Sequence, residues 1–261
     1  RNGDSAVKKY EQKFNGRKTS QLRVSEKEIK EAQSKTRTKT RSAIRSADSA
    51  LFASDVDLRK RVGGFTNQHY SWVLKQSFVP IPSVGCYIPG GQARYPSSVV
   101  MSVTTAKRAG VKRIVVVSPP GPDGKIDPLT VVAAKICGAT EIYKVGGAQA
   151  IGALAYGTKS IPKVDKIVGP GGKFVSIAKS LVSDQTAIDM VAGPTELGIM
   201  VDASSDPELV ALDLISQAEH SKDTMCFVIT QSKTMAKQIQ KSIEKLIPGV
   251  ERSSIIKESI S

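Results

Sequence analysis

The sequence predicts an α/β fold, in which a mainly parallel sheet flanked by helices forms incomplete Rossmann-like lobes behind a helical, basic amino-terminal segment. Beyond Pro82, short runs of β-branched residues recur, and each is followed by a turn and a helix-like stretch. Strands that alternate with helices in this way are typical of βαβ units and parallel sheets. Within the amino-terminal part, small and charged residues dominate residues 35–60, which contain neither Gly nor Pro, and this favours helices.

The amino-terminal segment carries a clear start signal for a helix. Ser25 and Glu28 form a capping box, in which each side chain satisfies a backbone N–H group that the first helical turn leaves unpaired. Gly16 marks a break before this helix, and the glycine pair at 63–64 ends the helical stretch. We assign residues 1–82 to a helical amino-terminal part of the first lobe.

The segments that follow have the spacing of a βαβ unit. The runs 113–117 and 141–145 begin 28 residues apart, and a helical segment from about 128 to 137 lies between them. This pattern assigns residues 83–195 to a nucleotide-binding lobe. Further strands are predicted at 165–168, 197–201 and 225–230.

The last two predicted strands are joined by a helix that begins at Asp206 and Pro207, a capping aspartate followed by a first-turn proline. We interpret residues 196–261 as a return of the chain to the first lobe.

Composition limits the class of protein. With 40% hydrophobic residues, a chain of 261 residues can bury a core, no run of 18 apolar residues predicts a membrane span, and no secretory signal precedes the first helix. Cys86, Cys137 and Cys226 are far apart and outside CxxC spacing, which indicates neither a disulfide framework nor a cysteine zinc cluster. We expect a soluble, cytoplasmic protein, and we expect its natural amino terminus to lie upstream of Arg1.

The positive charge is concentrated in the amino-terminal segment. Residues 1–61 carry 17 Lys and Arg against 8 Asp and Glu, a balance of +9 within a total of +14. A basic stripe can neutralise phosphates, but Tyr10 and Phe14 are the only aromatic residues before Phe52, so stacking platforms for bases are scarce. We expect a solvent-exposed basic helical surface, or attraction of anionic cofactors, and no dedicated nucleic-acid site.

Three glycine turns, at 87–91, 146–150 and 169–172, follow predicted strands. In an open parallel sheet the carboxyl ends of the strands meet at one edge, where cofactors bind. We therefore expect the turns at Tyr87, Gln149 and Gly171 to cluster. Each turn alone is more often an ordinary strand-to-helix connection, and none matches the GxGxxG dinucleotide fingerprint. Together they favour a ligand edge.

Gln217 and His220 are spaced to share one face at the end of the predicted helix that begins at Asp206. That face could hold two metal ligands, because imidazole is a good zinc donor. A glutamine oxygen is a weak and uncommon donor, so spacing alone favours a surface or capping histidine.

Two other residues are weaker candidates for a role in substrate binding or catalysis. The Thr195 hydroxyl at the start of a strand could orient a polar substrate or complete the Gly-Pro turn before it. Cys86 lies beside the first glycine turn, but no histidine is near it in sequence to activate a thiolate, so a buried structural thiol is the better interpretation.

Taken together, these segments resemble the signature segments of the histidinol dehydrogenase family, in order and along essentially the whole chain. The matching segments are 84–91 (VGCYIPGG), 145–151 (VGGAQAI), 169–171 (GPG), 187–190 (AIDM) with 192–194 (AGP), and 217–220 (QAEH). The resemblance implies oxidation of L-histidinol to L-histidine by way of an aldehyde, with two NAD molecules reduced in turn.

The resemblance also implies roles for single residues. Tyr87 and Gln149 match positions that contact NAD, and Gly172 stands where the family usually has an asparagine that contacts NAD. Thr195 matches a substrate-contacting hydroxyl that is usually serine in the family. With glycine at 172, one cofactor hydrogen bond is either lost or supplied by a neighbour such as Lys173, whereas the threonine keeps the hydroxyl oxygen.

Gln217 and His220 match two of the family's four zinc ligands, and both positions also adjoin the substrate. The family's remaining ligands and its Glu-His pair of general bases are expected beyond Ser261, with one ligand supplied by the partner subunit of a homodimer. We therefore expect residues 1–261 alone to bind zinc weakly and not to oxidise histidinol.

Two alternatives stay open. The same loops would serve a related zinc- and NAD-dependent dehydrogenase of another small polyol, such as a sulfonated propanediol. The chain could also be a catalytically inactive fragment or a basic binding module.

Overall fold

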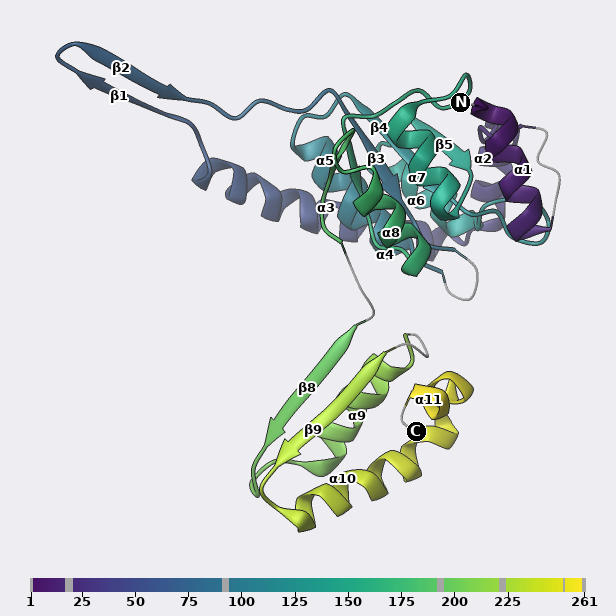
Figure 1. The fold of residues 1–261 in the computed structure, drawn as a ribbon, viewed down its shortest axis with the longest axis vertical. Coiled ribbons are helices and arrows are strands. Elements are labelled where there is room, and N and C mark those ends of the chain that lie inside the picture. Colours follow the sequence, from purple (N-terminus) through teal and green to yellow (C-terminus); the bar gives the residue numbers. More distant parts are fainter. Residues whose placement is uncertain are drawn as a thin grey trace. The chain divides into compact units, whose positions relative to one another are not determined.

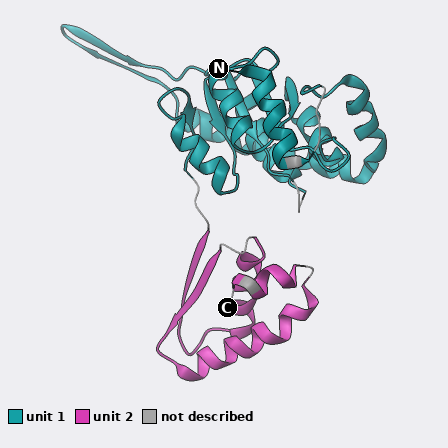
Figure 2. Ribbon diagram, turned by 45° about the vertical axis from the view of Figure 1, so that its right-hand side comes forward, with its two compact units in different colours: residues 1–191 teal, residues 192–261 magenta. Residues whose placement is uncertain are grey.

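The structure, a computed structural model, describes residues 2–16, 21–90, 94–191, 195–220, 224–250 and 252–259. The chain folds into two compact units, each described separately below (Figure 2). Unit 1 comprises residues 1–191, and unit 2 comprises residues 192–261.

The centre of unit 1 is a five-stranded parallel sheet in the order β5-β4-β3-β6-β7 (Figure 1). The chain enters at the central strand β3, moves outward through β4 to β5, and then returns to the other side of β3 to form β6 and β7. This doubly wound order confirms the predicted fold class and places the reversal of direction between β3 and β6. The strands are β3 Ser83–Tyr87, β4 Arg113–Ser118, β5 Glu141–Lys144, β6 Lys166–Val168 and β7 Ala187–Ile188.

Helices cover both faces of this sheet, so its inner strands are almost continuous runs of buried apolar residues. Side chains alternate between the two faces: Val116 belongs to the cluster on one face, whereas Val115 and Val117 belong to the cluster on the other. The covering helices are α6 Pro128–Cys137, α7 Gly147–Tyr156, α8 Lys173–Leu181, and the continuous helix made of α4 Pro96–Val99, the π-helical turn η1 Val100–Thr104 and α5 Thr105–Arg108.

The amino-terminal helices pack onto the helices that cover the sheet. Helix α1 (Gly3–Asn15) packs on α7, and α2 (Glu26–Lys35) and α3 (Thr38–Arg61) pack on α6. The capping box of Ser25 and Glu28 is confirmed, and α1 ends at Gly16, which has a φ of 72°. Among the described residues of this segment, nearly every Lys and Arg is exposed, which confirms the predicted basic helical surface.

The end of the amino-terminal segment differs from the prediction. Residues 1–82 were assigned to a helical part whose helices end at the glycine pair 63–64, but they include an antiparallel hairpin, β1 (Phe65–His69) and β2 (Trp72–Gln76), which extends from the end of α3 (Figure 1). Both faces of both strands are exposed. The alternation of polar and apolar residues that marks a half-buried strand is therefore missing, and the hairpin gave no periodic signal.

Unit 2 is built on one parallel βαβ unit. Strand β8 (Glu196–Val201) pairs directly with β9 (Met225–Thr230), and helix α9 (Pro207–Ala218) connects the two strands. Asp206 caps α9 by accepting hydrogen bonds from the backbone of its first turn, as predicted. One face of the two strands packs on α9 and on α10 (Lys233–Leu246). The chain then continues through η2 Ile247–Gly249 and α11 Ser253–Ser259.

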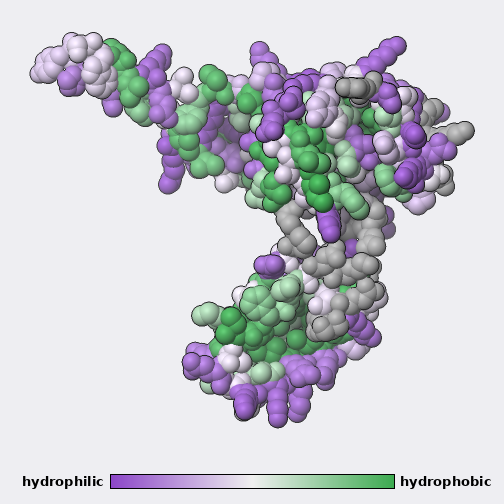
Figure 3. Space-filling view, in the orientation of Figure 1, coloured by the Kyte–Doolittle hydropathy of each residue, from purple (hydrophilic) through white to green (hydrophobic). Residues whose placement is uncertain are grey.

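The other face of β8 and β9 is exposed and apolar, and it forms a green surface in Figure 3. Within the ranges described above, no helix is both long enough and apolar enough to cross a membrane. The predicted sharing of one lobe by residues 1–82 and 196–261 stays a prediction.

Candidate functional site

The three predicted turns meet at the carboxyl edge of the sheet of unit 1. Tyr87 ends β3, and its phenol oxygen accepts a hydrogen bond of 3.1 Å from the N–H group of Gly147, in the turn after β5. On its other side, a Cβ atom added to Gly169, in the turn after β6, would overlap the carbonyl oxygen of Tyr87. The predicted clustering is therefore confirmed for the described residues; Gly91 of the first turn lies outside them.

Tyr87 joins the other two turns from a buried position. Its side chain belongs to the apolar cluster on one face of the sheet. Burial raises the pKa of the phenol, and the charge of Glu11 adds to this, while the hydrogen bond from Gly147 opposes it. Tyr87 is thus a neutral anchor at the point where the strand order reverses, between β3 and β6, where open parallel sheets bind ligands.

Glu11 of α1 holds the turn after β5, and the sequence analysis missed it. Its Oε1 atom accepts hydrogen bonds from the Gly146 N–H group at 2.9 Å and from Gln149 Nε2 at 2.7 Å. Glu11 is 0% exposed. One feature of the sequence could have indicated its burial. Glu11 follows the buried Val7 by four residues, which puts both side chains on the inward face of α1.

The turn after β6 is held by an ion pair between the buried Lys179 and the partly exposed Asp189. The Lys179 ammonium group, 2% exposed, donates to the Gly169 carbonyl oxygen at 3.1 Å and to the Asp189 carboxylate. Asp189 in turn accepts from the Gly169 N–H group at 2.8 Å. Burial alone would raise the pKa of Asp189, but hydrogen bonds from Lys179, Gly169 and Met190 outweigh it and hold this pKa below its usual value.

Lys179→Met tests this ion pair. We expect the free energy of unfolding of unit 1 to fall by about 2 to 3 kcal/mol at pH 7, less than for a fully buried pair, because the Asp189 side chain is 30% exposed. Since the folded-state pKa of Asp189 is lowered, its contribution to stability exists above the unfolded-state pKa and is lost as the pH falls. The difference between the two proteins should therefore be largest at neutral pH and shrink below about pH 4.

The measurement is urea unfolding followed by circular dichroism at pH 7 and pH 3.5. The exposed Lys173, at the start of α8, provides the matched control Lys173→Met, for which we expect a change below about 0.5 kcal/mol. A stability difference that stayed constant between the two pH values would contradict the role given to the Asp189 charge.

Gly171 and Gly172 differ in whether a side chain would fit at the position. A Cβ atom on Gly171 would overlap the side chain of Val175, whereas one on Gly172 would have no atom within 4 Å. Gly172 is the N-cap residue of α8 with φ −66° and ψ 175°, an extended conformation open to any residue. An asparagine would therefore fit at 172 without strain, and nothing steric in the described part of the chain excludes one.

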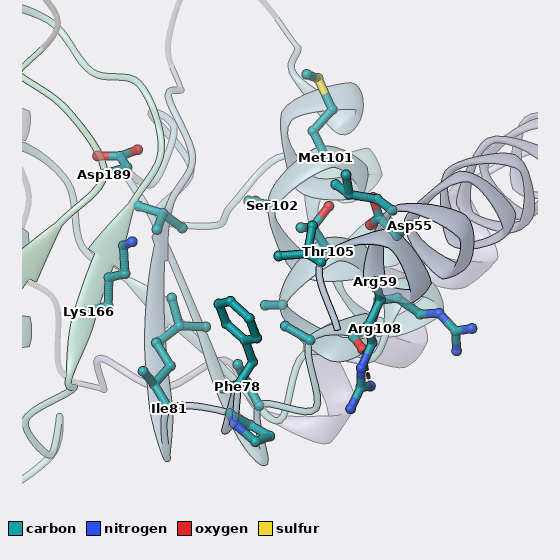
Figure 4. Close-up of a pocket in the computed structure, with 18 of the residues that line it drawn as sticks. Asp55, Arg59, Phe78, Ile81, Met101, Ser102, Thr105, Arg108, Lys166 and Asp189 are labelled. Atoms are coloured by element: carbon teal, nitrogen blue, oxygen red, sulfur yellow. Dashed lines mark hydrogen bonds between the residues drawn. The ribbon is translucent and has the colours of Figure 1, made fainter. Parts of the chain in front are cut away.

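A cavity of about 890 Å³ lies beside the turn after β6 (Figure 4). Its lining is mostly apolar, and it includes Val168, Gly169 and Asp189 on the sheet side and Met101 and Thr105 on the helix side. Ligand pockets of this size are common in enzymes.

Cys86 has no role as a nucleophile. Its side chain is fully buried, and burial raises the pKa of the thiol to about 12. The thiolate form needed for attack is therefore disfavoured, which confirms the structural interpretation.

The predicted substrate and metal residues lie at one end of unit 2. Thr195 directly precedes β8, and its carbonyl oxygen accepts a hydrogen bond of 3.1 Å from the Met225 N–H group at the start of β9. Because α9 runs antiparallel to the two strands, its carboxyl end, with Gln217 and His220, lies at the end where both strands begin. The adjoining residues 192–194, also part of a predicted segment, lie outside the described residues.

His220 was expected to lie within the helix, but the structure places it after the helix has ended. Helix α9 ends at Ala218, and His220 occupies the following turn, where its N–H group donates to the Gln217 carbonyl oxygen at 3.2 Å. The imidazole Nδ1 atom lies 2.9 Å from the Ser216 carbonyl oxygen, which requires a proton on Nδ1. In the neutral ring with this tautomer, Nε2 carries the lone pair, the arrangement that metal-ligating histidines commonly show.

No three His, Cys, Asp or Glu side chains gather at a metal-binding spacing in the part of the chain that the structure describes. Gln217 is half-buried and His220 is exposed, so both are accessible. An amide oxygen and an imidazole nitrogen are two of the donor types that zinc accepts, and the role of Gln217 and His220 as ligands stays a prediction.

Comparison with known proteins gives one family. The model of the family described as histidinol dehydrogenase matches residues 1–261. The histidinol dehydrogenase of Bacillus cereus is 44% identical over 259 residues, and that of Methanocaldococcus jannaschii is 42% identical over 258 residues. Each alignment covers 99% of this chain and 60% of the relative.

A solved structure of the same family also resembles this chain. The histidinol dehydrogenase of Elizabethkingia anophelis superposes with a TM-score of 0.90 at 34% identity, covering 98% of this chain and 59% of that chain. An NAD-dependent aldehyde dehydrogenase from Sinorhizobium meliloti superposes with a TM-score of 0.54 at 13% identity, which shows a likeness of fold alone.

Proposed function

The chain belongs to the histidinol dehydrogenase family, and from this we propose that it forms the amino-terminal and central portion of an enzyme that oxidises L-histidinol to L-histidine in histidine biosynthesis. The observation that carries the proposal is the meeting of three glycine turns at Tyr87, where the strand order of the sheet reverses. The chain spans about 60% of the length of the curated relatives that it matches, so the activity is a proposal for the complete gene product.

The proposed reaction consumes two NAD molecules. In the first step histidinol would lose a hydride from its carbinol carbon to NAD and a proton from its hydroxyl group, which gives histidinal. Water would then add to the aldehyde, and loss of a second hydride and two protons from this hydrate would give the carboxylate. One water molecule supplies the second carboxylate oxygen, and the two NADH molecules carry away the four electrons. We assign no catalytic base to residues 1–261.

The residues at the edge of unit 1 fit a dinucleotide. Gly146, Gly147 and Gly169 let the turns pack closely on Pro119, Gln149 and Tyr87. Helices α7 and α8 begin in two of these turns, and the positive end of a helix dipole attracts phosphate. Tyr87, Gln149 and Gly172 are the proposed contacts. NAD, when bound, supplies the hydride acceptor.

The residues at the end of unit 2 fit half of a metal site. Gln217 Oε1 and His220 Nε2 are the proposed zinc ligands, and the Thr195 hydroxyl is the proposed substrate contact beside them. Zinc, when bound, would hold and orient the substrate. The further ligands belong to a proposed homodimer, and the free state of Cys86, Cys137 and Cys226 suits the proposed cytoplasmic location.

The test is NADH production by the complete gene product, with zinc present, from L-histidinol and from a sulfonated propanediol in separate assays and in competition. We expect two NADH molecules per histidinol and little from the sulfonate. NADH from the sulfonate alone would transfer the function to another small alcohol. No NADH from either substrate, with binding of nucleic acid that weakens as salt rises, would favour a binding module.

A further inference from the structure

We infer that Glu11 is a positioning residue, which orients the side-chain amide of Gln149 so that its carbonyl oxygen faces the dinucleotide. Gln149 would then recognise a hydrogen-bond donor of the cofactor, a hydroxyl or carboxamide N–H group, and would turn away a phosphate oxygen. This inference rests on the proposed function, because it assumes that the edge of unit 1 binds NAD.

Glu11 is held in place beside the turn after β5. Helix α1 is fixed to unit 1 at two further points: Val7 is buried in the cluster beneath α7, and Asp4 accepts hydrogen bonds from the N–H and hydroxyl groups of Ser160 at 3.2 and 2.6 Å. A carboxylate buried without hydrogen bonds would be strongly destabilising, and the donors Gly146 and Gln149 offset that cost.

Glu11 also sets the orientation of the Gln149 amide. An ionised carboxylate only accepts hydrogen bonds, so of the two ends of the Gln149 amide only Nε2 can lie 2.7 Å from Glu11. Without Glu11 the two ends would be nearly equivalent, and the amide could turn by half a rotation.

The Gln149 side-chain oxygen is then placed over Gly147. A Cβ atom added to that glycine would be only 2.9 Å from Gln149 Oε1. Gly147 has a φ of +61° and donates its N–H group to Tyr87. The oxygen is therefore held at the junction with Tyr87, and it presents a lone pair and no proton.

The test measures NAD binding by titration calorimetry in the complete gene product. Glu11→Leu removes the acceptor at similar size, and we expect NAD affinity to fall about tenfold, the equivalent of one lost hydrogen bond. Glu11→Gln keeps an acceptor oxygen for both donors and should stay within about threefold of the wild type. Gln12→Leu, at the exposed neighbouring position of α1, is the matched control and should leave the affinity unchanged.

A double-mutant cycle shows whether Glu11 acts through Gln149. We expect Glu11→Leu to weaken NAD binding by less than about threefold when Gln149 is already leucine. If Glu11→Leu has the same effect with and without Gln149, the positioning role is wrong. Glu11→Asp, which keeps the charge but withdraws the oxygen by one methylene, replaces Glu11→Leu if circular dichroism shows that the leucine variant does not fold.

The side-chain NH₂ signals of Gln149 provide a readout without cofactor. In the wild type they should exchange slowly with solvent, and in Glu11→Leu they should exchange faster. Slow exchange in both proteins would overturn the inference. A wild type that binds no NAD yet shows this difference would instead contradict the proposed function and leave the orientation of the amide supported.

Discussion

Replacing Gly169 by alanine is expected to lower the free energy of unfolding of unit 1 by about 2 to 6 kcal/mol, the combined range for a strained backbone and an overpacked side chain. Gly169 has a φ of +111°, which L side chains rarely adopt, and an added Cβ atom would overlap the Tyr87 carbonyl oxygen. The obstacle is backbone at the end of a central strand, so it cannot turn aside as a flexible side chain would.

Gly172→Ala is the matched control, three residues further along the same turn. Its φ of −66° is ordinary, and a Cβ atom there meets nothing within 4 Å. We expect a change of about 0.5 kcal/mol or less. Urea unfolding followed by circular dichroism gives both values, and hydrogen exchange of the β3 and β6 amides assigns the change to unit 1. Equal stability of the two variants would show that Gly169 is not constrained as described.

Replacing His220 by asparagine in the complete gene product is expected to lower zinc content and NADH production together. The rate at a fixed low zinc concentration should fall about 100-fold or more, since even changes to the outer partners of metal ligands cost about 10- to 100-fold. The fold should persist, because His220 is exposed in the turn after α9 and leaves no cavity when shortened. Metal content by atomic emission and the rate of NADH formation are the two measurements.

His69 provides the control, since it is the one other histidine of the sequence and lies exposed in the hairpin, stacked on Trp72. His69→Asn should change neither zinc content nor rate. Added zinc should partly restore the His220→Asn variant, which separates a weakened site from a misfolded protein. Unchanged metal content and rate in His220→Asn would remove His220 from the proposed ligands.

The features predicted correctly are those that local sequence determines. The central strands are buried on both faces and therefore read as runs of β-branched residues, such as 113–117. The capping residues Ser25 and Asp206 act within three residues of themselves, so their effect is visible in a short window. The hairpin at 65–76 contacts no apolar layer, and it was missed for that reason.

The candidate site was predicted in part. The glycine turns were found because each follows a strand, but the sequence cannot distinguish Gly169, whose conformation excludes other residues, from Gly172, whose conformation does not. Glu11 was missed because its partners lie 135 and 138 residues away, and Lys179 because its partners, ten residues away on either side, belong to other elements. In the sequence both resemble the other charged residues of exposed helices, and only the packing of α1 and α8 turns them inward.

The contact between Glu11 and Gly146 spans 135 residues of the chain, and this span affects how the protein folds during its synthesis. At about 5 to 20 residues added per second, a ribosome needs roughly 7 to 27 seconds to pass from one partner to the other. Helix α1 leaves the ribosome well before α7, yet its buried face, with Val7 and Glu11, has no docking surface until α7 has been made. During that interval a nascent chain exposes this face to chaperones and to other nascent chains.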